Sequence, residues 1–292
     1  FGNFAKLNNE NKISDEKLEE LSLNPSIEYI EPNYTYSIQV EENPSEKISY
    51  GRDNLFAKQW GLKNNGTNSS GWITPGKAGE DINAEKAWEL QTGSSEIVIA
   101  VIDTGVGFKH PDLQGNLWIN QAEQDGEAGV DDDGNGYVDD VYGYDFVNKD
   151  SDPTDGHGHG THCAGVIAAG HDNGGVKGVM SSAKIMSLKF LGDNGSGTTA
   201  GAIEAINYAV NNGAHILSNS WGGGPKSQAL EDAIIAANDK GILFVAAAGN
   251  SRNDNDEYDT FPANYDVDNV ISVGAMDGRG RKASFSNVCF SK

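Results

Sequence analysis

Residues 96–105, EIVIAVIDTG, decide the fold expected for this chain. The stretch is a continuous apolar run that closes in Asp-Thr-Gly, which is typical of a strand buried on both faces of a sheet. Similar runs follow downstream: AKIMSLKFLG, AHILSNSWG, ILFVAAAGN and VISVGAM. Helical stretches separate most of them, and two of these helices are expected to end at Gly213 and Gly241. This alternation predicts a doubly wound α/β fold, a mostly parallel sheet flanked by helices.

Composition narrows the class of protein. The chain has 292 residues, 37% of them hydrophobic, which suffices for one large domain with a small appendage or for two ordinary domains. Its formal net charge of −22 repels nucleic acid and anionic membrane surfaces, so neither is expected as a partner. No apolar run reaches the ~18 residues of a membrane-spanning helix. The two cysteines, Cys163 and Cys289, are expected to be free thiols.

The N-terminal part differs from the rest. In residues 1–40, ISDEKLEELSLN predicts an amphipathic helix that begins near Ser14, and SIEYIEPNYTYSIQV alternates like a strand. Residues 41–52 are polar and contain a proline, as an exposed linker would. Residues 53–292 form the expected α/β domain. Because the sequence opens on Phe1 without a leader, we expect the natural N-terminus to lie upstream.

Three polar residues stand at element ends in the expected sheet. Asp103 closes one strand, Asn250 closes another, and His159 begins a helix between glycines. Chemistry in such sheets lies beyond the carboxyl ends of the strands. These residue types compose most of an acyl-transfer site, in which Asp orients His, His moves a proton and Asn holds an oxyanion. The alternative is structural, with Asp103 closing an Asx-turn and Asn250 capping a turn.

Four motifs, in this order, resemble the subtilisin-like serine peptidases (subtilases, peptidase family S8): VIAVIDTGVGFKHPDL, HGHGTHCAGVIAA, SNSWGGG and ILFVAAAGN. The resemblance runs from about Asp53 to about Asn287. It implies a secreted, monomeric serine endopeptidase that hydrolyses polypeptides through an acyl-enzyme. It also implies that Asp103 and His159 are the triad aspartate and base and that Asn250 is the oxyanion residue.

The same resemblance implies how substrate is held. Two extended segments would clamp the substrate backbone as an added strand, and a third would line the pocket for the residue before the cut. These positions are Gly195, Ser196, Gly197, Ser220, Trp221, Gly222, Ala248 and Gly249. Residues 1–40 then resemble part of a ferredoxin-like propeptide, an inhibitor domain whose cleavage site would fall within 37–52. A cis bond is implied before Pro262.

The other histidines of DGHGHGTHCAG allow a rival interpretation. His157, His159 and His162 have the H-x-H-x-x-H spacing of some zinc hydrolases. Those enzymes carry an aspartate where this chain has Thr161, so the zinc set is incomplete. Under the peptidase interpretation His162 is structural, His157 is a loop residue near the cleft, and Cys163 packs beneath the base.

The nucleophile of the resembled family is not found in these residues. It lies in a Gly-Thr-Ser-Met-Ala turn well after a segment like ASFSN, which here spans residues 283–287, and the chain contains no Gly-Thr-Ser. The sequence therefore predicts a truncated enzyme that is inactive by itself. The alternative is a non-catalytic module that keeps the cleft to bind peptides. A second chain carrying the turn would restore activity only in the first case.

Calcium is the expected cofactor, as a structural ion. The family resemblance implies one site at Asp53, Asp112 and Asp172, completed by carbonyl groups of Gly170, Gly174 and Val176. The acidic loop DDDGNGYVDD, residues 131–140, predicts a second one. Its alternating acids and glycines resemble the start of an EF-hand loop. The candidate ligands of that second site are Asp131, Asp133, Asn135 and Asp139.

Overall fold

The computed structural model describes residues 4–7, 13–38, 55–67 and 75–289. Its α-helices are α1 (Asp15–Ser22), α2 (Ala84–Trp88), α3 (Gln121–Asp125), α4 (His159–Ala168), α5 (Thr199–Asn211) and α6 (Gln228–Asn238). Its strands are β1 (Thr35–Ile38), β2 (Val98–Asp103), β3 (Gly143–Asp145), β4 (Lys184–Lys189), β5 (Ser196–Thr198), β6 (Ile216–Asn219), β7 (Trp221–Gly222), β8 (Leu243–Ala247) and β9 (Val270–Val273). Short 3₁₀ turns cover Phe56–Lys58 and Gln114–Asn116.

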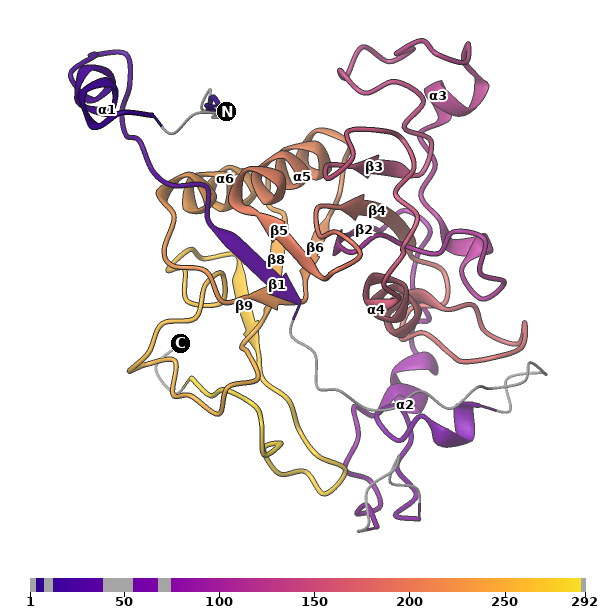
Figure 1. Ribbon diagram of the computed structural model, residues 1–292. Coiled ribbons are helices and arrows are strands. Elements are labelled where there is room, and N and C mark those ends of the chain that lie inside the picture. The colour runs from indigo at the N-terminus through magenta and orange to yellow at the C-terminus, as the bar shows by residue number, and fades with distance from the viewer. Residues whose placement is uncertain (1–3, 8–12, 39–54, 68–74, 290–292) are drawn as a thin grey trace.

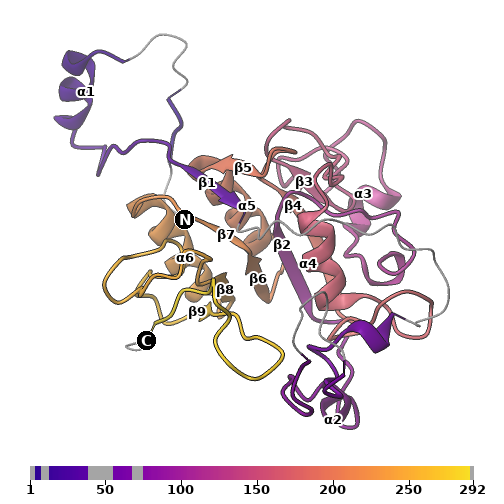
Figure 2. The same cartoon turned by 60° about the horizontal axis from the view of Figure 1, so that its bottom comes forward.

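The main sheet confirms the expected fold class. Its six strands run in the order β3-β4-β2-β6-β8-β9, and every neighbouring pair is parallel. β2 buries both of its faces. Ala100 and Ile102 pack in the core that contains α5 and α6. Ile99 and Val101 pack on the other side with Ala164 of α4. Helices therefore cover both faces, as Figures 1 and 2 show.

The two long helices begin and end where the sequence indicates. The Thr198 side chain accepts the Gly201 N–H at the start of α5, and the Ser227 side chain accepts the Leu230 N–H at the start of α6. Each hydroxyl thus satisfies a backbone donor that the helix itself leaves without a partner. The glycines expected to end these helices, Gly213 and Gly241, both adopt positive φ.

A second, three-stranded sheet lies across the carboxyl ends of the main one. Its order is β5-β1-β7, with β1 antiparallel to both neighbours. The central strand comes from the N-terminal part of the chain and is the indigo arrow of Figure 1. The other two are the segments that the sequence assigned to substrate binding. This small sheet therefore joins the N-terminal segment to the α/β domain.

The N-terminal segment is less regular than the sequence predicted. The helix over residues 15–22 is present but buries none of its residues, and the strand expected over residues 26–40 begins only at Thr35. The preceding residues instead cap helices. Glu31 accepts the Gln228 N–H (2.9 Å) at the start of α6, and Asn33 accepts the Ala200 N–H (2.9 Å) at the start of α5. The residues just before Thr35 therefore take no part in a β-sheet, and their side chains bond to helix ends instead. The linker predicted at 41–52 lies outside the described residues.

Candidate active site

A buried aspartate and a histidine meet at the carboxyl edge of the main sheet. Asp103 ends β2 with 1% of its surface exposed, and its Oδ1 lies 2.7 Å from Nδ1 of His159, the first residue of α4. Burial alone lowers the pKa of His159, but the hydrogen bond and the charge of Asp103 outweigh it and raise that pKa. This is the pairing in which a carboxylate orients an imidazole and leaves the far ring nitrogen to exchange a proton.

The turn after β2 is held from two sides. The backbone N–H groups of Phe190 and Leu191, just after β4, both donate to the Asp103 carbonyl oxygen at 3.1 Å. On the other side, α4 approaches so closely that a Cβ at Gly160 would overlap the Gly105 carbonyl oxygen. Glycine at position 160 is therefore required for the first turn of α4 to reach the aspartate.

Asp155 is a supporting residue to which the sequence interpretation gave no role. Its carboxylate accepts the Thr104 hydroxyl (2.9 Å) and both the N–H and the hydroxyl of Thr161 (2.9 and 2.6 Å). Burial by itself raises the pKa of Asp155, but these bonds and those from the His157 and Gly158 amides lower it overall. Asp155 thus ties the β2 turn to the start of α4. The signal was available in D-G-H-G-H-G-T, an acid placed before a helix start.

The remaining residues of the DGHGHGTHCAG segment do not form the rival zinc site. Among the described residues, only two groups bring three ligand atoms within 4.8 Å of one another, and neither contains His157 or His162. The His157 and His159 rings are 6.4 Å apart. His162 lies one turn further along α4 and is exposed. His159 points instead to Asp103, with the Cys163 Sγ 4.0 Å from its Nδ1. The structure does not gather the rival zinc set, since His157 lies in the loop before α4 and His162 lies one turn after His159 on the helix.

The predicted substrate-binding segments form a slot one strand wide. Gly197 of β5 lies opposite Tyr36, and Ser196 lies opposite Ser37. On the other side Gly222 faces Ser37, and Trp221 faces Ile38. The Ile38 N–H also donates to the Gly195 carbonyl oxygen at 2.9 Å. Ser220 directly precedes β7. Residues 35–38 of this same chain therefore occupy the slot as its middle strand.

One side chain of that strand is fully buried. Tyr36 is 1% exposed, and its ring lies 5.2 Å from the Trp221 ring in an edge-to-face arrangement. Its hydroxyl donates to the Pro225 carbonyl oxygen at 3.2 Å. A Cβ at Gly224 would overlap the ring, so glycine is needed there. The sequence interpretation missed Gly224 and Pro225, because what makes them important is a tyrosine almost 190 positions away.

Asn250, the predicted oxyanion residue, follows β8. The carboxyl ends of parallel strands share one edge, so it lies along the same edge as Asp103. Ala248 before it is buried, and Gly249 has a φ of 109°. The Phe261–Pro262 peptide bond is cis, as the resemblance implied.

The first predicted calcium set is only partly described. Asp53 lies outside the described residues. Asp112 is buried and accepts the Val176 N–H at 3.2 Å, so an amide, rather than the expected carbonyl, faces it. The Asp172 carboxylate is exposed and pairs with Lys177 Nζ at 3.1 Å. This first calcium set stays a prediction, since one of its three aspartates lies outside the described residues.

The acidic loop gathers a different set from the predicted one. Glu123 of α3, Asp133 and Asp140 bring one carboxylate oxygen each within 4.8 Å of one another. Asp140 is fully buried; burial raises its pKa, partly offset by hydrogen bonds from Tyr208, Asn135 and Asn120.

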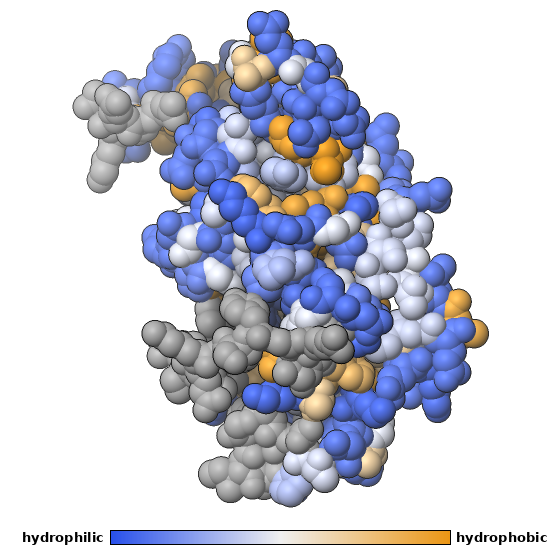
Figure 3. All heavy atoms as spheres, turned by 90° about the vertical axis from the view of Figure 1, so that its right-hand side faces the viewer, coloured by the Kyte–Doolittle hydropathy of each residue, from blue (hydrophilic) through white to orange (hydrophobic). Residues whose placement is uncertain are grey.

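Two predicted ligands of the acidic loop point elsewhere. Asp131 accepts the Asn135 and Gly136 N–H groups (3.1 and 2.9 Å), and Asp139 accepts the Gly129 N–H. Asn135 stays with the cluster, donating to Asp133 and Asp140 at 3.0 Å each. Gly134 and Gly136 both adopt positive φ within this loop, so spacing along the chain does not by itself show which side chains converge. The side of the molecule that includes α3 is mostly hydrophilic, with small scattered apolar patches (Figure 3).

The comparisons agree with this architecture. The chain matches the Subtilase family over residues 94–291, and it belongs to that family. It is 37% identical over 269 residues to the thermophilic serine proteinase of Bacillus sp. (strain AK1), covering 91% of this chain and 54% of that protein. It is 38% identical over 208 residues to thermitase of Thermoactinomyces vulgaris, covering 71% of this chain and 64% of that protein.

The fold is also that of a solved relative. The crystal structure of a cold adapted subtilisin-like serine proteinase matches with a TM-score of 0.57 and 30% identity, covering 78% of this chain and 68% of that chain. The present chain thus spans between about half and two thirds of the length of these relatives. No helix within the described residues is long and apolar enough to cross a bilayer. Family membership supports serine-type peptidase activity in general.

Proposed function

We propose that this chain supplies the acid–base pair, the oxyanion donor and the substrate slot of a secreted serine endopeptidase. The observation that carries the proposal is the 2.7 Å contact between Asp103 and His159, at the edge where two strands clamp a third. Both features belong to one reaction, because the clamped strand delivers a peptide bond and the imidazole activates the hydroxyl that attacks it.

In the proposed reaction, His159 Nε2 takes the proton from a serine hydroxyl, whose oxygen attacks the scissile carbonyl carbon. The Asn250 amide donates to the oxyanion that forms. His159 then returns the proton to the leaving amine, and water repeats the sequence to release the acyl group. Asp103 keeps Nδ1 protonated and stabilises the imidazolium.

The serine is proposed to come from a Gly-Thr-Ser turn outside these 292 residues, since the sequence contains none. Once residues 35–38 have left the slot, the chain would then bind peptide without cutting it. A chain extended through that turn should react with a fluorophosphonate probe, and His159→Ala should abolish the reaction. Loss of hydrolysis in chelator without any probe labelling would contradict the serine mechanism.

A second candidate is a peptide-binding module without catalysis. It is favoured by the slot, which the described residues complete and in which a strand already lies. The two candidates separate when a second chain carrying the Gly-Thr-Ser turn is added. Recovered hydrolysis supports the enzyme; unchanged peptide binding with no hydrolysis supports the module.

Residues 1–40 are proposed to act as an inhibitory propeptide. The support is that residues 35–38 fill the slot a substrate would need, while Glu31 and Asn33 attach the segment to α6 and α5. Removal of this segment would be required before a substrate could enter.

Calcium is proposed as a structural ion of the acidic loop. Glu123, Asp133 and Asp140 fit it, because three converging carboxylate oxygens suit a hard cation. The ion would offset the mutual repulsion of these carboxylates. A second ion at Asp53, Asp112 and Asp172 remains the family-based proposal.

A further inference from the structure

The segment ASFSN, residues 283–287, ends in a buried amide that the proposed chemistry does not use. Asn287 is 1% exposed and packs against the loop that follows β8. We call residues 248–253 the oxyanion loop, since Asn250 lies at its centre. The side chain and backbone of Asn287 both contact this loop, although more than 30 positions separate them in the chain.

The contacts bracket Asn250 on both sides. Before it, the Asn287 N–H donates to the Gly249 carbonyl oxygen at 2.9 Å. After it, Asn287 Oδ1 accepts the backbone N–H of Ser251 at 2.8 Å and that of Asn253 at 3.1 Å. The backbone on either side of Asn250 is thus fixed by one residue.

The other end of the amide is fixed as well. Asn287 Nδ2 donates to Asn255 Oδ1 at 3.0 Å and to Thr260 Oγ1 at 3.3 Å. Asn255 in turn donates to the Ala248 carbonyl oxygen at 2.9 Å, which closes the network on the oxyanion loop. A Cβ at Gly249 would lie 2.6 Å from Nδ2, so the loop passes directly against the amide. Because both ends of the amide are engaged, its orientation is determined.

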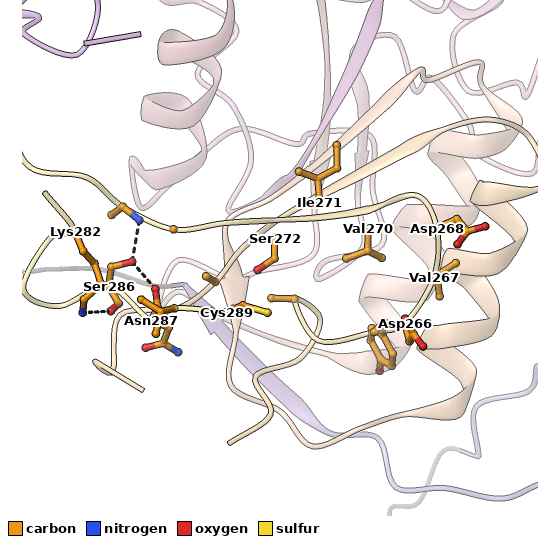
Figure 4. Close-up of a pocket in the computed structure, with 16 residues that line it drawn as sticks. Asp266, Val267, Asp268, Val270, Ile271, Ser272, Lys282, Ser286, Asn287 and Cys289 are labelled. Carbon is orange, nitrogen blue, oxygen red and sulfur yellow. Dashed lines mark hydrogen bonds between the residues drawn. The ribbon is translucent and has the colours of Figure 1, made fainter. Parts of the chain in front are cut away.

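Asn287 is itself held firmly. Ser286 Oγ donates to the Asn287 carbonyl oxygen at 2.8 Å and accepts the Ala275 N–H, also at 2.8 Å. Lys282 Nζ donates to the Ser286 carbonyl oxygen at 3.0 Å. Figure 4 shows these three labelled side chains together beside β9. The residue that contacts the oxyanion loop is therefore anchored to the segment that follows β9.

We infer that Asn287 is a positioning residue for the oxyanion site, holding the Asn250 amide where the developing negative charge appears. This inference rests on the proposed function of Asn250. An oxyanion donor stabilises a transition state only when its geometry is set in advance, and displacement by ~1 Å can cost ~10²-fold in rate. Asn287 supplies that constraint through bonds to both neighbours of Asn250.

The first test uses the 292-residue chain and needs no catalysis. Asn287→Ala removes the acceptor of the Ser251 and Asn253 amides, so their hydrogen exchange should accelerate by at least ~10-fold. The matched control is Asn269→Ala, which removes another buried amide that bonds the Ile242 carbonyl oxygen at 2.8 Å near the opposite end of β8. That control should leave exchange at Ser251 unchanged. Equal exchange at Ser251 in the two variants would overturn the inference.

The second test uses a chain extended through the nucleophile turn. Asn287→Ala should lower kcat by ~10²-fold with KM unchanged, as expected for a group that acts only on the transition state. In an Asn250→Ala background the same substitution should lower kcat by less than ~3-fold, because its effect passes through Asn250. If the two substitutions lowered kcat independently, so that their effects multiplied in the double variant, the inference would be overturned.

Two further outcomes are separable. If Asn287→Ala does not fold, the isosteric Asn287→Asp keeps the Oδ1 acceptor of the Ser251 and Asn253 amides, so hydrogen exchange at Ser251 should stay within ~3-fold of the unsubstituted chain. Exchange accelerated by ~10-fold or more in that folded variant would overturn the inference. If Asn250→Ala itself leaves hydrolysis intact, the proposed function of Asn250 is wrong, and exchange at Ser251 still decides whether Asn287 holds the loop.

Discussion

Tyr36→Ala should free residues 35–38 from the slot between β5 and β7. Tyr36 is the only residue of β1 whose side chain is buried. Its side chain is enclosed by the α/β domain: the ring contacts Trp221, the hydroxyl bonds to Pro225, and Gly224 leaves room for the ring. The backbone ladder alone would leave the strand held by only a few hydrogen bonds.

The size of the effect follows from these contacts. Burying the ring contributes about 2–3 kcal/mol, its edge contact with Trp221 about 1 kcal/mol, and the hydroxyl bond to Pro225 about 1 kcal/mol. The sum, about 4–5 kcal/mol, is in the range for truncating a buried aromatic. Since about 1.4 kcal/mol changes an equilibrium constant tenfold, the equilibrium constant for release of residues 35–38 from the slot should rise by roughly 10³-fold.

Hydrogen exchange at the Ile38 amide measures that opening, because the amide donates to the Gly195 carbonyl oxygen. Exchange should accelerate by roughly 10³-fold in Tyr36→Ala, up to the rate of an unprotected amide. Tyr36→Phe loses only the hydroxyl bond and should change it by about 5-fold. Tyr29→Phe, which removes an exposed bond to Asp232, should change it by less than about 3-fold. Unchanged exchange in Tyr36→Ala would refute the reasoning.

Three further outcomes are expected. Folding raises the pKa of His159 above its ordinary 6.5. The stabilisation that His159 contributes is therefore complete below about pH 6.5 and is lost as the pH rises through the folded-state pKa. An NMR titration of the ring should show the raised pKa, and Asp103→Asn should lower it. Calcium should raise the melting temperature, because it binds the folded state. Asp133→Ala should remove most of that rise in a thermal melt, and Asp131→Ala far less. Equal losses in the two variants would contradict the proposed ligands Glu123, Asp133 and Asp140. Gly160→Ala should destabilise by about 1–3 kcal/mol in denaturant unfolding, since its Cβ would overlap a backbone oxygen; unchanged stability would contradict the close approach of α4.

The sequence was a good guide to features that depend on local order. Apolar runs predicted five of the six strands of the main sheet, because burial in a parallel sheet favours continuous hydrophobicity, but the short strand β3 (Gly143–Asp145) was not predicted. Terminal glycines indicated where α5 and α6 end. The pairing of Asp103 with His159 could be anticipated because both stand at element ends that a parallel sheet brings to one edge.

The sequence alone therefore determined the α/β architecture, the family and the residues at the sheet edge. Only the tertiary structure decided which distant side chains complete them. At the acidic loop, Glu123 and Asp140 converge with Asp133, whereas Asp131 and Asp139 accept backbone N–H groups. Asp155 and Asn287 acquired their roles through hydrogen bonds to other segments, and Tyr36 through its contacts with Trp221 and Pro225. Such contacts join residues far apart in the chain, so their geometry depends on packing and leaves no periodic signal in the sequence.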